Sequence, residues 1–217
     1  MKLLIILSSN YFHNNWCDNI KCLNDYMKNN GIEYDYCGIS GRNDFYIYET
    51  IIKFKYKIIN TKKQLSKICD FITEYKSELD YDWYIKIRPE IKLFDNIDFR
   101  MLPDNAINAR ARVYNGPRKI QYGMSVNGEG DWKNVGDCHY AENEHNIIID
   151  DMLYIFHKNI VQNNAFEIIP TSGTENEWLH TDVFNQRKIR LNVIGSNLCM
   201  TRGGYLRDGC FSGNINM

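Results

Sequence analysis

The fold is decided by residues 81–91, which read Tyr-Asp-Trp-Tyr-Ile-Lys-Ile-Arg-Pro-Glu-Ile. On a strand, alternate side chains point to opposite faces, so Trp83, Ile85 and Ile87 share one face. The opposite face carries Tyr84, Lys86, Arg88 and Glu90. Pro89 cannot donate to a sheet ladder, so we expect the strand to break there. Such a strand lies either inside a parallel sheet, where its charges need partners, or at a sheet edge with one solvated face.

The residues before this stretch alternate between strand and helix patterns. An apolar run predicts a strand over residues 3–7. Residues 32–39, stopped by Ser40-Gly41, are a second strand candidate, and the loose alternation of residues 51–59 suggests a third. Helical spacing of apolar residues predicts helices over 16–28 and 60–79, with Asn60-Thr61 as the cap of the second. Strands that alternate with helices are typical of an α/β domain, so we expect a single domain with a central, mostly parallel sheet flanked by helices.

The second half of the chain is less periodic. Residues 102–147 hold Gly-Pro and Asn-Gly-Glu-Gly, which predicts an irregular segment with short strands. Residues 147–161 are expected to form a helix opened by Asp150-Asp151, because acids favour the first turn of a helix. A further helix is predicted over 175–186 and a late strand over 191–199.

Composition excludes several classes of protein. The 217 residues include 26 basic and 27 acidic side chains, a net charge of −1, which argues against a nucleic-acid partner. No apolar run approaches the roughly 20 residues of a membrane span, and the start lacks a signal-peptide cleavage site. The seven cysteines are odd in number and show no C-x-x-C spacing, which favours a reducing cytoplasm over a disulfide framework or a zinc site.

Motifs narrow the choice further. No G-x-G-x-x-G, P-loop or G-x-S-x-G sequence occurs, which argues against dinucleotide-binding, P-loop and α/β-hydrolase functions. Open α/β sheets bind ligands at the carboxyl ends of their strands. Arg88 and Glu90 lie at such an end.

Residues 83–91 resemble the strand end of GT-A glycosyltransferases, where an Asp-x-Asp motif holds a divalent metal on the diphosphate of a sugar nucleotide. The stretch is similar to an Arg-x-Asp variant in small glycosyltransferase domains of large DNA viruses. The resemblance implies one GT-A-like domain, in which residues 1–95 bind the nucleotide sugar and residues 96–217 bind the acceptor. It implies transfer of a sugar from a nucleotide donor, with a UDP-sugar expected, to a glycan or glycoprotein acceptor. In a virus this would take place in the host cytoplasm.

This sequence departs from the common motif, because Arg88 replaces the first carboxylate and Glu90 the second Asp. Mg²⁺ and Mn²⁺ prefer oxygen ligands, so one carboxylate holds them more loosely than two. The resemblance assigns a metal to Glu90, with His180 as a weaker ligand. Arg88 can instead neutralise a diphosphate itself, so metal dependence stays open. Asp82 precedes the strand and is interpreted mainly as a turn or strand-start residue.

Other donor-side roles follow from position. Ser8, Ser9 and Asn10 come directly after the first predicted strand, where this fold places the nucleotide base and ribose. Arg110 and Arg112 fall on one face of an extended segment. They are candidates for phosphate or acceptor recognition, with a pair of solvent-facing arginines as the alternative.

The acceptor-side base is expected among Asp150, Asp151, Glu175 and Glu177, with Glu177 slightly favoured. Each of these acids also fits a plain helix start, and Thr174 with Glu177 matches a capping box. A non-catalytic GT-A-like module that binds a sugar nucleotide or glycan is the competing interpretation, favoured by the single motif carboxylate. A sugar-nucleotide pyrophosphorylase is less favoured, since the first strand is not followed by a Gly-rich, basic loop.

Overall fold

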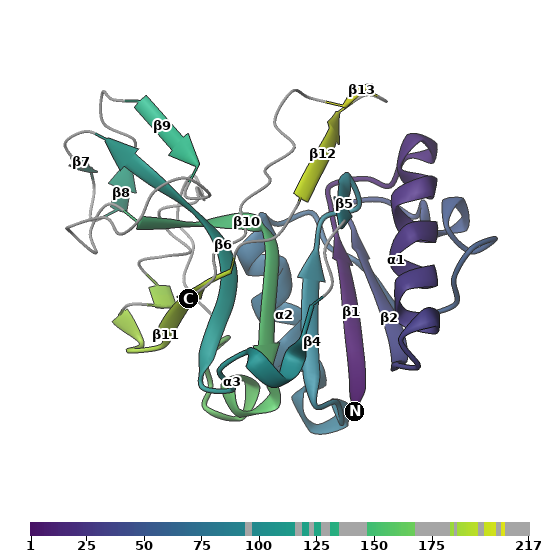
Figure 1. Ribbon diagram of the computed structural model, residues 1–217, viewed down its shortest axis with the longest axis horizontal. Coiled ribbons are helices and arrows are strands. Elements are labelled where there is room, and N and C mark those ends of the chain that lie inside the picture. The colour runs from purple at the N-terminus through teal and green to yellow at the C-terminus, as the bar shows by residue number, and fades with distance from the viewer. Residues whose placement is uncertain are drawn as a thin grey trace.

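The computed structural model describes the chain over residues 1–93, 97–115, 119–121, 124–126, 131–134, 147–167, 183–184, 186–194, 198–202 and 205–206 (Figure 1). Side chains are described over a narrower set, residues 1–93, 97–109, 152–167, 183–184, 186–192 and 194.

Eight strands of the described chain form one twisted sheet. They are β1 (Lys2–Ser8), β2 (Glu33–Ser40), β3 (Phe54–Ile59), β4 (Trp83–Ile87), β6 (Ala106–Asn115), β9 (Asp131–Asn134), β10 (Ile147–His157) and β11 (Arg190–Val193). The order is β11-β6-β10-β4-β1-β2-β3, with β9 paired to β6. β10 runs antiparallel to β4 and β6, while the other neighbours along this path are parallel. The predicted mostly parallel sheet is confirmed.

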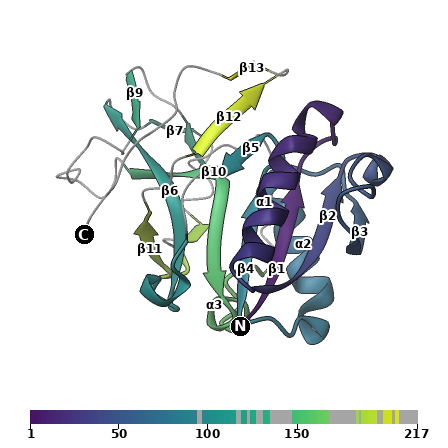
Figure 2. The same cartoon turned by 45° about the vertical axis from the view of Figure 1, so that its right-hand side comes forward.

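Helices cover both faces of the sheet, and smaller strands extend its upper edge in Figure 1. The helices are α1 (Cys17–Asn29), α2 (Gln64–Tyr75) and α3 (Lys158–Gln162), with single 3₁₀ turns η1 (Asn14–Trp16), η2 (Phe45–Ile47), η3 (Lys76–Glu78) and η4 (Phe99–Met101). β5 (Ile91–Leu93) pairs with β12 (Leu198–Arg202), which pairs with β13 (Tyr205–Leu206). β7 (Lys119–Gln121) and β8 (Met124–Val126) form a separate hairpin. Figure 2 shows α1 in front of β1 and α2 behind the sheet.

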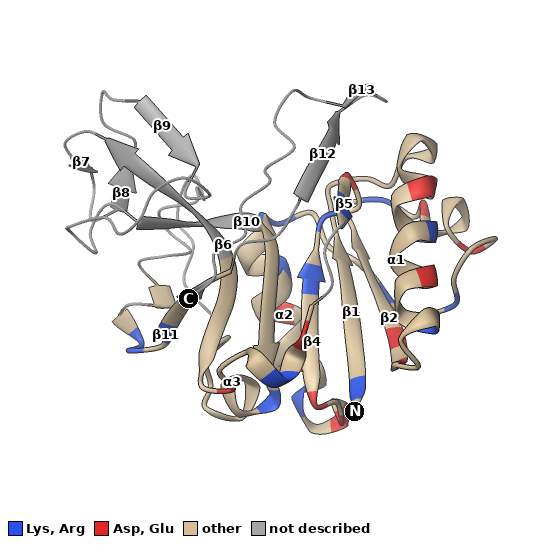
Figure 3. Ribbon diagram, in the orientation of Figure 1, with Lys and Arg blue, Asp and Glu red and all other residues tan. Residues whose placement is uncertain are grey.

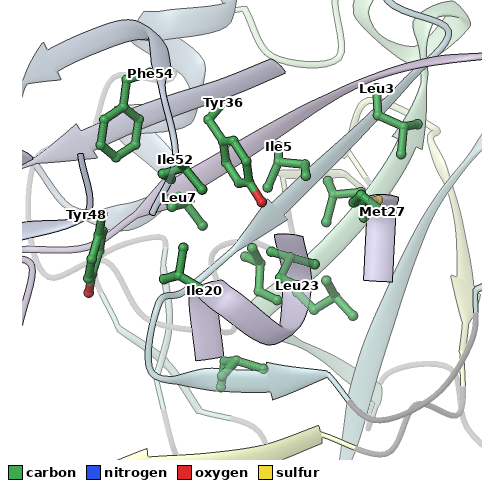
Figure 4. Packing of buried hydrophobic residues seen from close by; sticks show 14 of the residues in the cluster. Leu3, Ile5, Leu7, Ile20, Leu23, Met27, Tyr36, Tyr48, Ile52 and Phe54 are labelled. Atoms are coloured by element: carbon green, nitrogen blue, oxygen red, sulfur yellow. The ribbon is translucent and has the colours of Figure 1, made fainter. Parts of the chain in front are cut away.

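The two cores follow from strand alternation along β1. Leu3, Ile5 and Leu7 pack with Ile20, Leu23 and Met27 of α1 (Figure 4). Leu4 and Ile6 point to the other face and join a cluster that includes Leu65, Ile68 and Ile72 of α2 and Ile160 and Val161 of α3. An apolar run therefore suits this strand, since both of its faces are buried.

The strand of residues 83–87 lies inside the sheet, between β1 and β10, so the edge-strand alternative is wrong. Trp83, Ile85 and Ile87 join the core on the α1 side, while Tyr84 joins the core on the α2 side. All five residues of β4 are buried, Lys86 included. The chain leaves the sheet at Pro89, as predicted, and β5 begins at Ile91.

The predicted helix over residues 147–161 is wrong. Its first eleven residues form β10, which fills the gap between β4 and β6, and only Lys158–Gln162 are helical. Asp150 and Asp151 lie where the pairing of β10 with β6 shifts register, between Ile149 and Tyr154. The sheet absorbs them in an irregularity of the strand, whereas the sequence pattern suggested a helix start.

Two smaller expectations also change. α2 begins at Gln64 with Lys63 as its N-cap, so the predicted cap at Asn60-Thr61 is wrong. The Asn60 side chain accepts from Lys62 N through Oδ1 and donates to Asp70 through Nδ2. The predicted late strand over residues 191–199 is divided between β11 and β12, which lie in different sheets. Of the helix predicted over 175–186, residues 183, 184 and 186 are described and helical, and the rest lies outside the described residues.

Candidate functional site

Three neighbouring parallel strands end together at the upper edge of the sheet in Figure 1. Leu7 of β1 lies opposite Ile87 of β4, and Ser8 lies opposite Ile39 of β2. The segments after β1 and β4, Ser9-Asn10 and the turn that begins at Arg88, therefore leave the sheet at the same level. This carboxyl edge is where an open α/β sheet binds its ligands.

The loop after β1 is held from two sides. Ser8 Oγ donates to Gln64 Oε1 of α2 at 2.8 Å, and Ser9 N donates to Ile39 O at 3.0 Å. Ser8 and Ser9 are buried, whereas Asn10 is exposed. The Ser8 hydroxyl thus serves the packing of α2, and Asn10 is the member of this predicted trio that reaches solvent.

Lys67 is a residue that sequence reasoning missed. It is fully buried, and its ammonium donates to Ser9 O at 2.6 Å and to Asn10 Oδ1 at 3.0 Å. A buried ammonium is costly unless hydrogen bonds satisfy it, so these bonds tie α2 firmly to the loop. The available signal was a lysine set between buried apolar positions of α2, Leu65 and Ile68.

The turn after β4 is fixed at three points. Ile91 N donates to Arg88 O at 3.0 Å, which closes a four-residue turn with Pro89 in its favoured second place. Arg88 N donates to Met152 O of β10 at 3.0 Å. Asn19 Nδ2 of α1, a buried side chain, donates to Pro89 O at 3.1 Å. Neighbours on both sides therefore set the position of Arg88 and Glu90.

Arg88 and Glu90 form an ion pair across this turn. Arg88 Nε donates to Glu90 Oε1 at 2.6 Å, and Nη2 contacts the same oxygen. The Glu90 side chain is 5% exposed and that of Arg88 25%. Burial raises the pKa of Tyr48 well above its usual value, and the nearby charge of Glu90 adds to that shift. The Arg88 guanidinium compensates the charge of the nearly buried Glu90 carboxylate, while part of the Arg88 side chain faces solvent.

A second buried lysine lies at the end of β4. Lys86 is fully buried, opposite Ile6 of β1 and Tyr154 of β10, and its ammonium lies 5.0 Å from the centre of the Tyr154 ring. Figure 3 shows basic residues at this end of the strand. Lys67, Lys86 and Arg88 are thus cations at this edge, where the buried carboxylates of Glu90 and Asp44 also lie.

An aromatic shelf, made of Tyr11, Trp16 and Arg42, flanks the loop after β1. Tyr11 is 43% exposed and stacks on Trp16 with ring centres 5.5 Å apart. The Arg42 guanidinium lies 5.7 Å from the centre of the Tyr11 ring. A partly exposed ring beside a guanidinium can receive a planar, electron-rich group. No pattern in the sequence linked these three residues, since their meeting depends on the fold.

The other predicted donor-side residues lie on β6. The backbone of Arg110 and Arg112 follows this strand, with Arg112 opposite Ile148 of β10 and Asn134 of β9. Their side chains lie outside the described set.

The predicted acids divide into two groups. Asp150 and Asp151 precede Met152, whose carbonyl accepts from Arg88, so the backbone brings this pair to the carboxyl edge. Glu175, Glu177 and His180 lie outside the described residues. The fold thus brings one of the two predicted acidic pairs near the turn after β4.

Asp82 lies at the opposite end of β4. Its Oδ2 accepts from Lys2 N at 3.0 Å and its Oδ1 from Lys158 Nζ at 3.1 Å. The backbone bond from Lys2, followed by the bond from Lys158, lowers the pKa of this carboxyl. Asp82 therefore joins the starts of β1, β4 and α3.

Two further features concern only the described residues. No group of three or more His, Cys, Asp or Glu side chains there has a geometry that could hold a metal ion. Within the same part of the chain, no helix is long and apolar enough to cross a membrane.

A groove of about 530 Å³ lies beside the first residues of β2, lined in part by Lys28, Tyr34 and Lys53. It is therefore separate from the carboxyl edge.

The sequence matches no protein-family model and no curated protein. Solved structures nevertheless share its architecture. An inositol-1-phosphate CTP transferase from T. maritima superposes with a TM-score of 0.50 at 9% identity, covering 92% of this chain and 88% of the other. A candidate glucose-1-phosphate thymidylyltransferase from Bacillus anthracis gives 0.50 at 12% identity, covering 92% and 89%.

A Drosophila β1,4-galactosyltransferase 7, in complex with manganese, UDP-Gal and xylobiose, also gives a TM-score of 0.50, at 6% identity. That match covers 88% of this chain and 64% of the other. The chain has a GT-A-like fold. At such identities the likeness concerns the fold, which nucleotidyltransferases and glycosyltransferases share. The fold alone does not decide among these reactions, so the function has to be argued from the site.

Proposed function

We propose that this protein is a glycosyltransferase that transfers a sugar from a nucleotide donor, a UDP-sugar in our account, to a glycan or protein acceptor. The observation that carries the proposal is the meeting of two fixed segments at one edge of a GT-A-like sheet. These are the loop Ser8–Asn10 and the turn that begins at Arg88. Residues 1–95 would supply the donor half of the site and residues 96–217 the acceptor half.

The nucleoside would lie against the loop after β1 and the aromatic shelf. Tyr11 offers a partly exposed ring surface, and Arg42 offers a guanidinium beside it. Aromatic faces bind nucleobases by stacking, which tolerates different bases. Asn10, exposed and hydrogen-bonded to Lys67, is the loop side chain best placed to reach the ribose. Ser8 and Ser9 contribute by shaping the loop.

The diphosphate would lie over the turn after β4. Arg88 can donate to phosphate oxygens and stabilise the negative charge that develops as the glycosidic bond of the donor breaks. Glu90 holds the guanidinium in place. Arg110 and Arg112 stay candidates for the phosphates or the acceptor, on the strength of their place along β6.

A divalent metal such as Mn²⁺ or Mg²⁺ would supply the same charge compensation in a GT-A site. The described side chains do not suit it well. Glu90 is 5% exposed, and one of its carboxylate oxygens is already in an ion pair with Arg88. His180, the weaker metal-ligand candidate, lies outside the described residues.

The acceptor hydroxyl would lose its proton to a carboxylate from the second half of the chain, in an inverting reaction. Asp150 and Asp151 gain support from their backbone position beside Met152, which accepts a hydrogen bond from Arg88. Glu175 and Glu177 remain candidates from sequence alone. The base takes the acceptor proton while the acceptor oxygen bonds to the anomeric carbon and the nucleoside diphosphate leaves.

A non-catalytic module that binds a sugar nucleotide or glycan is the second candidate. The observation that favours it is the Arg88–Glu90 ion pair, since it occupies the carboxylate at the position where the common motif holds its metal.

The deciding experiment incubates the protein with a panel of nucleotide sugars and mixed glycan or protein acceptors. It measures the release of nucleoside diphosphate together with the labelled product. Acceptor-dependent release with one donor supports the glycosyltransferase. Donor binding without any turnover across the panel would favour the binding module instead.

A further inference from the structure

Asp44 lies in the segment after β2 and bonds to the loop after β1. It is 8% exposed, and its Oδ2 accepts a hydrogen bond from Phe12 N at 2.8 Å. A buried backbone N–H without an acceptor destabilises the folded state, so this bond fixes where residue 12 lies. The residue before it is Tyr11, the exposed ring of the proposed nucleoside site.

Tyr48, from the same segment, holds both backbone groups of the next residue, His13. Tyr48 is fully buried, and its hydroxyl accepts from His13 N at 3.3 Å and donates to His13 O at 3.2 Å. The Phe12 ring packs on this segment as well, with its centre 4.9 Å from that of Tyr48 and 5.6 Å from that of Phe45. Hydrogen bonds and aromatic packing therefore hold the same part of the loop.

The Tyr11 ring is presented on this fixed backbone. It is 43% exposed, stacks on Trp16, and has the Arg42 guanidinium 5.7 Å from its centre. Because the loop is already held by Asp44 and Tyr48, a planar ligand can stack on Tyr11 without first ordering the loop. Less binding free energy is then lost to conformational entropy.

We infer that Asp44 and Tyr48 are positioning residues of the nucleoside site, an inference that rests on the proposed function. They fix the backbone of Phe12 and His13, and through it the ring of Tyr11 against which the base stacks. They act through the loop and make no contact with the ligand. Loss of either set of bonds should therefore weaken every ligand that contains the nucleoside by the same factor, whatever phosphates the ligand carries.

The test measures UDP affinity by isothermal titration calorimetry and uridine affinity by the displacement of UDP. Asp44→Ala removes the acceptor of Phe12 N and should lower both affinities by about tenfold or more, so that their ratio stays the same. Asp44→Asn keeps a side-chain oxygen that can accept from Phe12 N, and it should retain most of the wild-type affinity. Tyr48→Phe keeps the buried ring, deletes the hydroxyl, and should also weaken both ligands by one common factor.

Tyr26→Phe is a matched control for Tyr48→Phe. The Tyr26 hydroxyl accepts from Ile97 N at 2.9 Å and donates to Ile97 O at 3.3 Å, the same two bonds to a residue outside the loop after β1. This variant should lose a similar amount of stability and keep both wild-type affinities. Thermal melts establish that each variant is folded at the temperature of the titration.

Folded Asp44→Ala and Tyr48→Phe proteins that bind UDP and uridine like the wild type would overturn the inference and leave the proposed function standing. A loss of UDP affinity with unchanged uridine affinity would overturn it too, because the two residues would then act on the diphosphate. Asp44→Asn as weak as Asp44→Ala would show that the charge matters and the bond to Phe12 does not, which contradicts the inference for Asp44. A wild-type protein that binds neither ligand would overturn the proposed function itself, and the inference with it.

Discussion

The carbonyl oxygen of Asn10 accepts a hydrogen bond from the backbone N–H of Gly41 at 3.1 Å, and a Cβ at residue 41 would lie 2.7 Å from that same oxygen. The segments after β1 and β2 are thus so close that any side chain at this position would push them apart. The nucleoside part of the proposed site lies on this contact.

Gly41→Ala should therefore shift the loop that contains Asn10. Forcing one methyl group into a tight contact costs about 1–3 kcal/mol of folding free energy, and we expect UDP affinity to fall together with stability. Gly31→Ala is the control, since Gly31 has a φ of +62° and nothing within 4 Å of an added Cβ. It should lower stability by about 1 kcal/mol through backbone strain and leave UDP affinity unchanged. Equal UDP affinities for wild type and Gly41→Ala would remove this contact from the site.

Lys67→Met tests the buried ammonium below the loop. The change keeps the length of the side chain, deletes a positive charge, and leaves Ser9 O and Asn10 Oδ1 without a bond that they have in the wild type. We expect UDP affinity to fall about tenfold or more and the melting temperature to drop by a few degrees. Lys21→Met, at an exposed position of α1, serves as the control and should change neither quantity. A Lys67→Met protein that is less stable but binds UDP normally would confine Lys67 to a packing role.

Asp82→Asn tests the amino end of β4 and carries a pH signature. The bonds from Lys2 and Lys158 lower the folded-state pKa of Asp82 below its ordinary value of 3.8. A lowered pKa contributes stability above the unfolded pKa, and this contribution is lost as pH falls through the folded pKa. Because the side chain is partly exposed, we expect a loss of about 1 kcal/mol at neutral pH, measured by urea unfolding.

The difference between wild type and Asp82→Asn should shrink as the pH falls below 3.8 and on through the lower folded-state pKa, where the carboxyl becomes protonated in the folded chain as well. Asp98→Asn, in a solvent-exposed pair with Arg100, is the comparison and should change stability little at any pH. A stability gap for Asp82→Asn that is the same in acid and at neutral pH would contradict the charge-based explanation.

Amide substitutions at Asp150, Asp151, Glu175 and Glu177 locate the acceptor-side base. The true base, changed to its amide, should lower turnover by roughly 10²–10⁴ and leave UDP affinity nearly unchanged. Asp150 and Asp151 lie near Arg88 along the backbone, Glu175 and Glu177 lie outside the described residues, and the sequence slightly favoured Glu177. Four variants with wild-type transfer rates would exclude the whole set and point to a retaining reaction or a non-catalytic protein.

Elements with a strong local pattern were predictable from sequence. The apolar run of β1 and the alternation along β4 follow from burial on both faces of an inner strand, and Pro89 ends β4 as its missing N–H requires. Asp150 and Asp151 were predicted to open a helix, and this prediction from the local pattern was wrong. Acids are common at helix starts, but here the pairing of β10 with two neighbours decides the structure.

The candidate site was predictable only in part, because several of its contacts join segments that are far apart in the sequence. Arg88 and Glu90 stood out because charges at the end of an apolar strand are unusual. Lys67 is 58 residues from Ser9 in the chain, and its bond to that loop depends on how α2 packs against the sheet. The meeting of Tyr11 and Arg42 likewise depends on the parallel pairing of β1 with β2. Such contacts between distant segments have no local signature.

The central claim is that the carboxyl edge of this sheet binds a nucleoside diphosphate sugar, and thermal unfolding with added UDP, UDP-sugars and other nucleotide sugars tests it most directly. A ligand at 100 times its dissociation constant adds about 2.7 kcal/mol of stability. For a chain of this size that corresponds to a rise in melting temperature of roughly 5–10 °C. We predict such a rise with UDP or a UDP-sugar and a smaller one with uridine, which lacks the diphosphate. An unchanged melting temperature with every nucleotide and nucleotide sugar at millimolar concentration would contradict the account.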